Sequence, residues 1–174
     1  MHFNTFQMSV TQKAFMEAER LTGRFYYFSP EAFNIHRYDV KNLPYLESHE
    51  VVEEAFAHLC RYQYQKHPEA PAEDGYHFYR ICLQDNRILD AVERAGSFIK
   101  LGPLMLYIAT HELVHVVRFD QGASDFDASP KEKEREEDRV HDITRQILKS
   151  VLYPDLKLVL DCFSNDYRIG DLYN

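Results

Sequence analysis

Hydrophobic positions along the first third of the chain predict two helices with a short strand between them. Apolar and alanine residues recur at helical spacing over 10–21, and a glycine supplies a stop signal soon afterwards. The aromatic stretch 24–29 then predicts a strand. A second helix is expected over 49–65 with Ser48 as its N-cap, and His58 lies off its apolar face. The apolar stripe of that helix consists of Val52, Ala55, Phe56, Leu59 and Cys60.

The pattern beyond residue 65 predicts one strand and three helices. An exposed connection over 66–75 precedes an alternation of polar and apolar residues over 76–84, which predicts a strand. A short helix over 86–96 is expected to end at a glycine, and a strongly apolar helix over 103–119 opens at a proline. The last long helix is expected over 130–152. The final twenty residues carry no clear pattern.

Length and composition place these elements in one globular α+β domain that covers residues 1–174. The chain is 45% hydrophobic, with only 6 Gly and 7 Pro, which is typical of a packed protein rather than a disordered one. We therefore expect several helices packed on a small sheet. The formal net charge of −8, with no long basic run, disfavours nucleic acid and an anionic membrane surface as partners. Nothing in the sequence specifies an oligomeric state.

The same sequence favours a cytoplasmic protein without membrane spans. The first fifteen residues lack a charged segment followed by a continuous apolar one, so no secretory signal is expected. The three cysteines are odd in number and far apart, which favours reduced thiols over a disulfide framework. The most apolar segment, 101–117, is shorter than the roughly 20 residues a bilayer requires and contains three ionisable side chains. We therefore predict a buried helix there.

Those three ionisable side chains, His111, Glu112 and His115, form the motif "HELVH". Residues four apart lie one turn apart on the same helix face, so both imidazoles can reach one metal ion. This H-E-x-x-H spacing is typical of zinc sites in which the intervening carboxylate acts as a general base. Burying such groups without a metal or polar partners would be costly. The motif therefore predicts a zinc site.

A third protein ligand is expected on the helix that begins near residue 130, because a catalytic zinc site uses three protein ligands and keeps one position open. Glu137 is preferred because it shares a strip with His141, Thr144 and Leu148. Glu136 lies in line with the apolar stripe of the same helix, so the helical phase does not separate the two glutamates. Glu134 remains a third candidate. His141 is a candidate for a ligand or for a residue that orients one.

The motif "HELVH" followed by "EREEDRVHDITRQIL" resembles the zincin metallopeptidases that use a glutamate ligand, and more loosely the ImmA/IrrE-type peptidases. The resemblance covers about residues 103–150. It implies that His111, His115 and Glu137 bind zinc and that Glu112 is the general base of a hydrolase acting on a peptide or protein substrate. It also implies a zincin-like fold in which an edge strand holds the substrate beside the active-site helix, and the strand 76–84 is a candidate for that edge.

Three questions stay open at this point. His141, Tyr167 and Tyr173 are candidates for stabilising the oxyanion. Two acid-x-x-His elements, ending at His115 and His141, also suggest a di-iron bundle, but the residues between them leave no room for the intervening helix. The chain could also be a non-catalytic metal-binding or regulatory protein on a zincin scaffold, although Glu112 favours chemistry because a structural site needs no general base.

Overall fold

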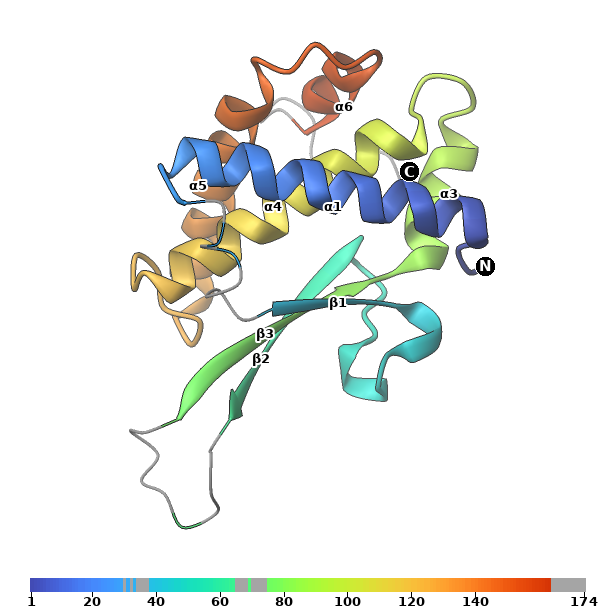
Figure 1. Cartoon of the computed structure of the whole chain (residues 1–174). Coiled ribbons are helices and arrows are strands. Elements are labelled where there is room, and N and C mark those ends of the chain that lie inside the picture. Colours follow the sequence, from blue (N-terminus) through green and yellow to red (C-terminus); the bar gives the residue numbers. More distant parts are fainter. Residues whose placement is uncertain (30, 32, 34–37, 65–68, 70–74, 164–174) are drawn as a thin grey trace.

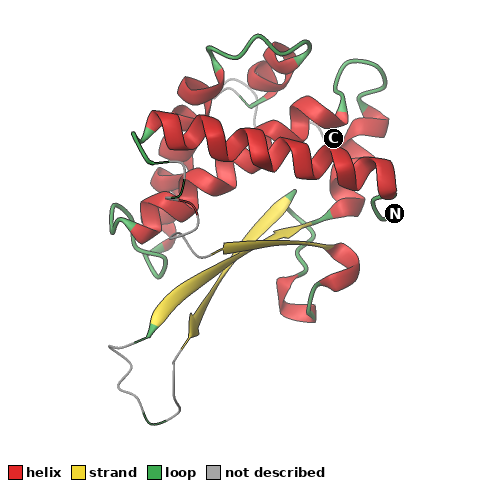
Figure 2. Ribbon diagram, viewed as in Figure 1, coloured by secondary structure: helices red, strands yellow, loops and turns green. Residues whose placement is uncertain are grey.

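The computed structural model describes residues 1–29, 31, 33, 38–64, 69 and 75–163. Within these residues the predicted α+β class is confirmed: five α-helices pack together on one side of a three-stranded sheet (Figures 1 and 2). The helices are α1 (Thr5–Phe25), α3 (Asp85–Arg94), α4 (Leu101–Asp120), α5 (Pro130–Leu148) and α6 (Leu156–Cys162). The strands are β1 (Tyr38–Asn42), β2 (Ala57–Tyr64) and β3 (Tyr76–Leu83).

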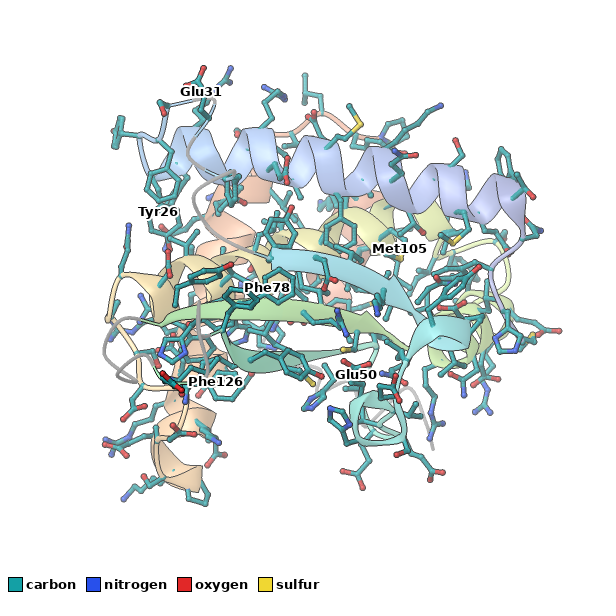
Figure 3. All side chains as sticks on the ribbon, turned by 60° about the horizontal axis from the view of Figure 1, so that its bottom comes forward. Tyr26, Glu31, Glu50, Phe78, Met105 and Phe126 are labelled. Atoms are coloured by element: carbon teal, nitrogen blue, oxygen red, sulfur yellow. The ribbon has the colours of Figure 1, made fainter. Side chains whose placement is uncertain are left out.

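The sheet has the strand order β1-β3-β2, with β3 parallel to β1 and antiparallel to β2. Successive side chains of β3 point to opposite faces, so Ile81 and Leu83 are buried in the core that the sheet shares with the helices. Arg80 and Cys82 lie on the other face. There Arg80 pairs with Asp39 of β1 at 2.9 Å and with Glu50 at 3.1 Å. Glu50, which Figure 3 labels, belongs to the short 3-10 helix Ser48–Glu50 that covers this face.

Helix α4 runs through the middle of the helical layer. Every residue from Pro103 to Val117 is buried, as the predicted apolar helix requires. Helix α1 lies along α4 and packs Ala14, Phe15 and Ala18 into the same core (Figure 1). None of the described helices is long and apolar enough to cross a membrane. Helix α4 therefore holds its polar side chains inside a protein core.

Two elements expected in the first half of the chain are wrong. The region 49–65 is not a helix, because 57–64 pairs with β3 and Ser48 begins only a 3-10 turn. The stretch 24–29 forms no strand: α1 continues through Gly23 to Phe25 and ends where Tyr27 takes a left-handed φ of 57°. The aromatic side chains there pack on one another instead of joining the sheet, with the rings of Tyr26 and Phe28 stacked at 5.6 Å.

The strand expected over 76–84 is confirmed, but it is the central strand and not an edge. The helices expected over 86–96 and 103–119 are also confirmed, as α3 and α4. Helix α5 begins at Pro130 as predicted, behind a capping box of Ser129 and Glu132, but ends at Leu148. Most of the connection 66–75 lies outside the described residues. Helix α6 occupies part of the C-terminal region that showed no pattern.

Candidate metal centre

The motif His111-Glu112-Leu113-Val114-His115 lies in the second half of α4, where helical spacing brings the two imidazoles together. The Nε2 atoms of His111 and His115 are 3.2 Å apart. Both histidines and Glu112 are buried, with exposed fractions of 9%, 6% and 8%. Each Nδ1 atom is buried without a hydrogen-bond partner among the described residues. The sequence motif therefore places two imidazole nitrogens side by side inside the core.

Glu137 on α5 completes the cluster, as the sequence analysis preferred. Its Oε1 lies 3.0 Å from Nε2 of His115, and its Oε2 lies 3.3 Å from Nε2 of His111. The side chain is 52% exposed, in contrast to the buried histidines, because it faces a cavity. One carboxylate thus reaches both imidazoles from the neighbouring helix.

The other glutamates of α5 take no part in this cluster. Glu136 forms a bidentate ion pair with Arg118 of α4, at 2.5 and 2.9 Å, so both of its oxygens are engaged. Glu134 is exposed and does not line the cavity. Asp138, which the di-iron alternative requires, is likewise exposed and outside the cavity lining. The pairing of Glu136 with Arg118 holds α5 against α4 and turns Glu137 toward the histidines.

His141 lies beside the cluster. Its ring centroid is 4.5 Å from that of His111, and ligand atoms of His111, Glu137 and His141 all lie within 4.8 Å of one another. Its Nδ1 is hydrogen-bonded to the hydroxyl of Tyr107 at 2.6 Å. The other two oxyanion candidates, Tyr167 and Tyr173, lie outside the described residues.

The donor atoms of His111, His115 and Glu137 are spaced close to the distances found in a tetrahedral zinc site. Zinc–nitrogen and zinc–oxygen bonds of about 2.0–2.1 Å at tetrahedral angles separate neighbouring ligand atoms by about 3.3–3.4 Å. The two imidazole nitrogens are 3.2 Å apart, and each lies close to a different oxygen of Glu137: Nε2 of His111 is 3.3 Å from Oε2, and Nε2 of His115 is 3.0 Å from Oε1. Two neutral imidazoles and one carboxylate are also the donor set of known catalytic zinc sites. These residues could therefore hold zinc with little rearrangement.

Burial and the carboxylate of Glu137 shift the pKa values of the cluster in opposite directions. Burial lowers the pKa of His111, which favours the neutral form that a metal ligand requires, and burial together with the neighbouring His111 lowers the pKa of His141 to about 4. Burial also acts on His115, but Glu137 outweighs it and raises the pKa of that imidazole. Burial disfavours ionisation of Glu137, yet its contacts with both histidines lower its pKa below the usual range. Burial raises the pKa of Glu112 to about 7.

A cavity of about 1150 Å³ opens over this cluster. Helix α4 contributes the two histidines and Glu112, α5 contributes Glu137 and His141, and residues of β2 form the opposite wall. The loop between α4 and α5 closes one end against β2: Arg61 pairs with Asp127 at 2.5 Å and its guanidinium lies 4.7 Å from the ring centre of Phe126, labelled in Figure 3. The cluster therefore faces a space large enough for part of a peptide.

Sequence reasoning missed two components of this site. The first is β2, the edge strand along the cavity; its half-buried His58 lines the space and is not a helix-surface residue as expected. Alternating side chains over 57–64, with Tyr and Cys among them, were the available signal for a strand. The second is Tyr107. Its position four residues before His111 places it on the same helix face, so the spacing 107, 111, 115 could have identified it.

A second group of possible metal donors, Glu50, Cys60 and Cys82, lies on the far face of the sheet. Glu50 already accepts hydrogen bonds from Tyr62 at 2.5 Å, Arg80 at 3.1 Å and the backbone N–H of Glu47. The two thiols lie 4.0 Å apart, and no disulfide forms among the three cysteines, in agreement with the predicted reduced thiols. This group is accounted for as a buried polar network.

Comparison of the chain with known protein families, curated proteins and solved structures finds no match. The argument for a function therefore depends on the geometry of the site.

Proposed function

We propose that the protein is a zinc-dependent metallopeptidase with a zincin-like fold. The observation that supports this best is the convergence of His111, His115 and Glu137 at 3.0–3.3 Å, with the buried Glu112 lining the same cavity. A site that only held a metal would have no need of the fourth side chain. A carboxylate between two metal-binding histidines is what hydrolysis requires.

Zinc bound by these three residues would supply a Lewis acid that polarises a carbonyl and acidifies water. Glu112 is the proton carrier. It takes a proton from the attacking water as the water oxygen bonds to the carbonyl carbon, and it passes this proton to the leaving nitrogen as the C–N bond breaks. The products are a carboxylic acid and an amine, and transfer of the remaining water proton from the acid to the amine gives a carboxylate and an ammonium group.

The substrate we propose is a peptide segment lying along β2. Among the described residues this strand pairs with β3 on one side only, and its residues 57–62 line the same cavity as the histidines. An extended peptide can add to such an edge through main-chain hydrogen bonds. The role that the zincin resemblance suggested for 76–84 thus passes to β2. A cytoplasmic location, which the free thiols support, belongs to the same proposal.

The test is digestion of a proteome-derived peptide library by the zinc-loaded full chain, with cleavage products identified by mass spectrometry. The variant Glu112→Gln keeps the size of the side chain but cannot accept the proton. We expect it to bind zinc as the wild type does and to lose about 10²-fold or more in turnover. Bound zinc without cleavage by the wild type would favour a non-catalytic metal-binding protein. Near-full activity of Glu112→Gln would exclude the mechanism.

A further inference from the structure

We propose that this site is an exopeptidase centre that removes one or two residues from the amino-terminal end of a peptide. The inference rests on the peptidase function proposed above and names the substrate class of the same site. It is carried by the position of the closed end of the cavity, which lies close to the cluster of His111, His115 and Glu137.

The closed end is a bridge from β2 to the loop between α4 and α5. Arg61 of β2 pairs with Asp127 at 2.5 Å, and its guanidinium lies 4.7 Å from the ring centre of Phe126. Arg61 is opposite Tyr79 in the sheet, so the two side chains lie on the same face. Tyr79 stacks on Phe119 of α4 with ring centroids 6.3 Å apart, so this face is the one toward the helices. The bridge therefore crosses the space between the sheet and the helices.

A short row of aromatic rings separates the cluster from this bridge. The rings of His115 and Phe119 stack with centroids 5.7 Å apart, and the rings of Phe119 and Phe126 meet edge to face at 5.2 Å. The rings of His115 and Phe126 are therefore no farther apart than these two steps laid end to end. That length equals about three residues of an extended chain at about 3.3 Å each, and the thickness of the rings takes up part of it. One or two substrate residues fit between the cluster and the bridge.

The cavity extends farther in the opposite direction. Its wall follows β2 from Arg61 back to Ala57, a stretch of about 13 Å at the spacing of a strand. Beyond that point the lining includes Arg87 and Arg94 of α3, a helix that begins two residues after Leu83, the partner of Ala57 in the sheet. A bound peptide can therefore have a long segment on one side of the cleaved bond and only a short segment on the other.

The direction of β2 determines which end of the peptide occupies the short segment. The strand runs from Ala57 to Tyr64, so its chain direction leads from the long part of the cavity toward the bridge. A peptide that adds to the free edge of β2 forms its more stable hydrogen-bond pattern when it runs antiparallel. Its amino terminus then lies beside Arg61. Hydrolysis at the cluster releases the first one or two residues and leaves a peptide with a new amino terminus.

The first test maps the products of one peptide and of two versions extended by a few residues at the amino or the carboxyl end. The full chain, loaded with zinc, should release the first one or two residues of every version, so the cleaved bond should move with the amino-terminal extension. The same peptide fused through its amino terminus to a folded protein should not be cleaved. Cleavage at a fixed internal bond, or release of carboxyl-terminal residues, would overturn this proposal and leave the peptidase function standing. A wild type that cleaves no peptide would refute both.

The second test opens the bridge. Phe126→Ala removes the closing ring, and Asp127→Ala frees Arg61 by changing a side chain that is 73% exposed and outside the hydrophobic core. Each variant should cleave the fused peptide at least about 10-fold faster than the wild type, because a steric block to longer substrates is removed. The matched control is Arg139→Ala, which changes an exposed residue of α5 outside the cavity lining and should keep the wild-type products. If both bridge variants, with wild-type zinc content and circular dichroism, still spared the fused peptide, the bridge would not limit the substrate.

Discussion

Replacing Glu137 with alanine would remove one of the three proposed zinc ligands and leave the rest of the fold nearly intact. The side chain is 52% exposed and contributes nothing to the hydrophobic core. Its removal leaves two buried imidazole nitrogens without a partner, a cost that the exposure of Glu137 to water reduces, so the metal-free protein should lose about 1 kcal/mol of stability. Any larger effect measured in the presence of zinc can then be assigned to the metal.

The size of that effect follows from linkage between binding and folding. Free zinc at 100 times its Kd should stabilise the wild type by about 2.7 kcal/mol. For a chain of 174 residues each kcal/mol shifts Tm by about 2–4 °C, so zinc should raise Tm by about 5–10 °C. Loss of a residue that orients a ligand can lower the affinity for zinc by about 100-fold, and loss of a direct ligand should lower it at least as much. At the same zinc concentration about 0.4 kcal/mol then remains, a shift of about 1 °C.

Scanning calorimetry with and without zinc at pH 7.5, together with elemental analysis of bound metal, measures this difference. The matched control is Glu134→Ala, an exposed glutamate of the same helix that does not line the cavity. It should keep the full zinc-induced shift. If Glu137→Ala kept that shift, or if Glu134→Ala lost it, the assignment of the third ligand would be wrong.

Two further outcomes test the surroundings of the site. Arg118→Met leaves Glu136 without its partner in a largely buried ion pair and should lower the free energy of unfolding, measured in urea, by about 2 kcal/mol. Adding Glu136→Leu in a double variant should restore most of this loss. An unchanged free energy of unfolding for Arg118→Met would contradict this role of the pair. Burial raises the pKa of Glu50, but hydrogen bonds from Tyr62, a backbone amide and Arg80 outweigh it and lower the pKa to about 2. Ionised Glu50 therefore stabilises the fold by about 3 kcal/mol at pH values above its ordinary pKa. This stabilisation is lost as the pH falls from about 5 to 2. The free energy of unfolding in urea should therefore change less with pH across that range for Glu50→Gln than for the wild type. An equal pH dependence of the two proteins would refute this role of Glu50.

Several features could be predicted because local geometry determines them. The four-residue spacing of His111 and His115 places both rings on one face of any helix, whatever surrounds it. The apolar residues around them require that helix to be buried, as α4 is. Likewise Ser129, Pro130 and Glu132 begin α5 through contacts within a few residues. These predictions involve interactions between near neighbours in the chain.

The choice between Glu136 and Glu137 could not be made in this way. Adjacent positions on a helix differ by about 100°, and the apolar face of α5 is broad enough to include either. Packing against α4 decides the matter, because Arg118 engages Glu136 and leaves Glu137 to face the histidines. The contact of Tyr107 with His141 is likewise a product of two helices meeting.

The edge strand is the clearest case in which tertiary structure decided the outcome. The sequence 57–64 has apolar residues that suit a helix as well as a strand, so its local pattern favoured the wrong element. Its backbone hydrogen bonds are made with β3, which lies beyond a long connection in the chain. A helix satisfies its backbone groups within itself, whereas a strand depends on a partner that the local sequence does not contain. The sequence by itself therefore determined the buried helix that carries His111 and His115, and only the fold determined what faces it.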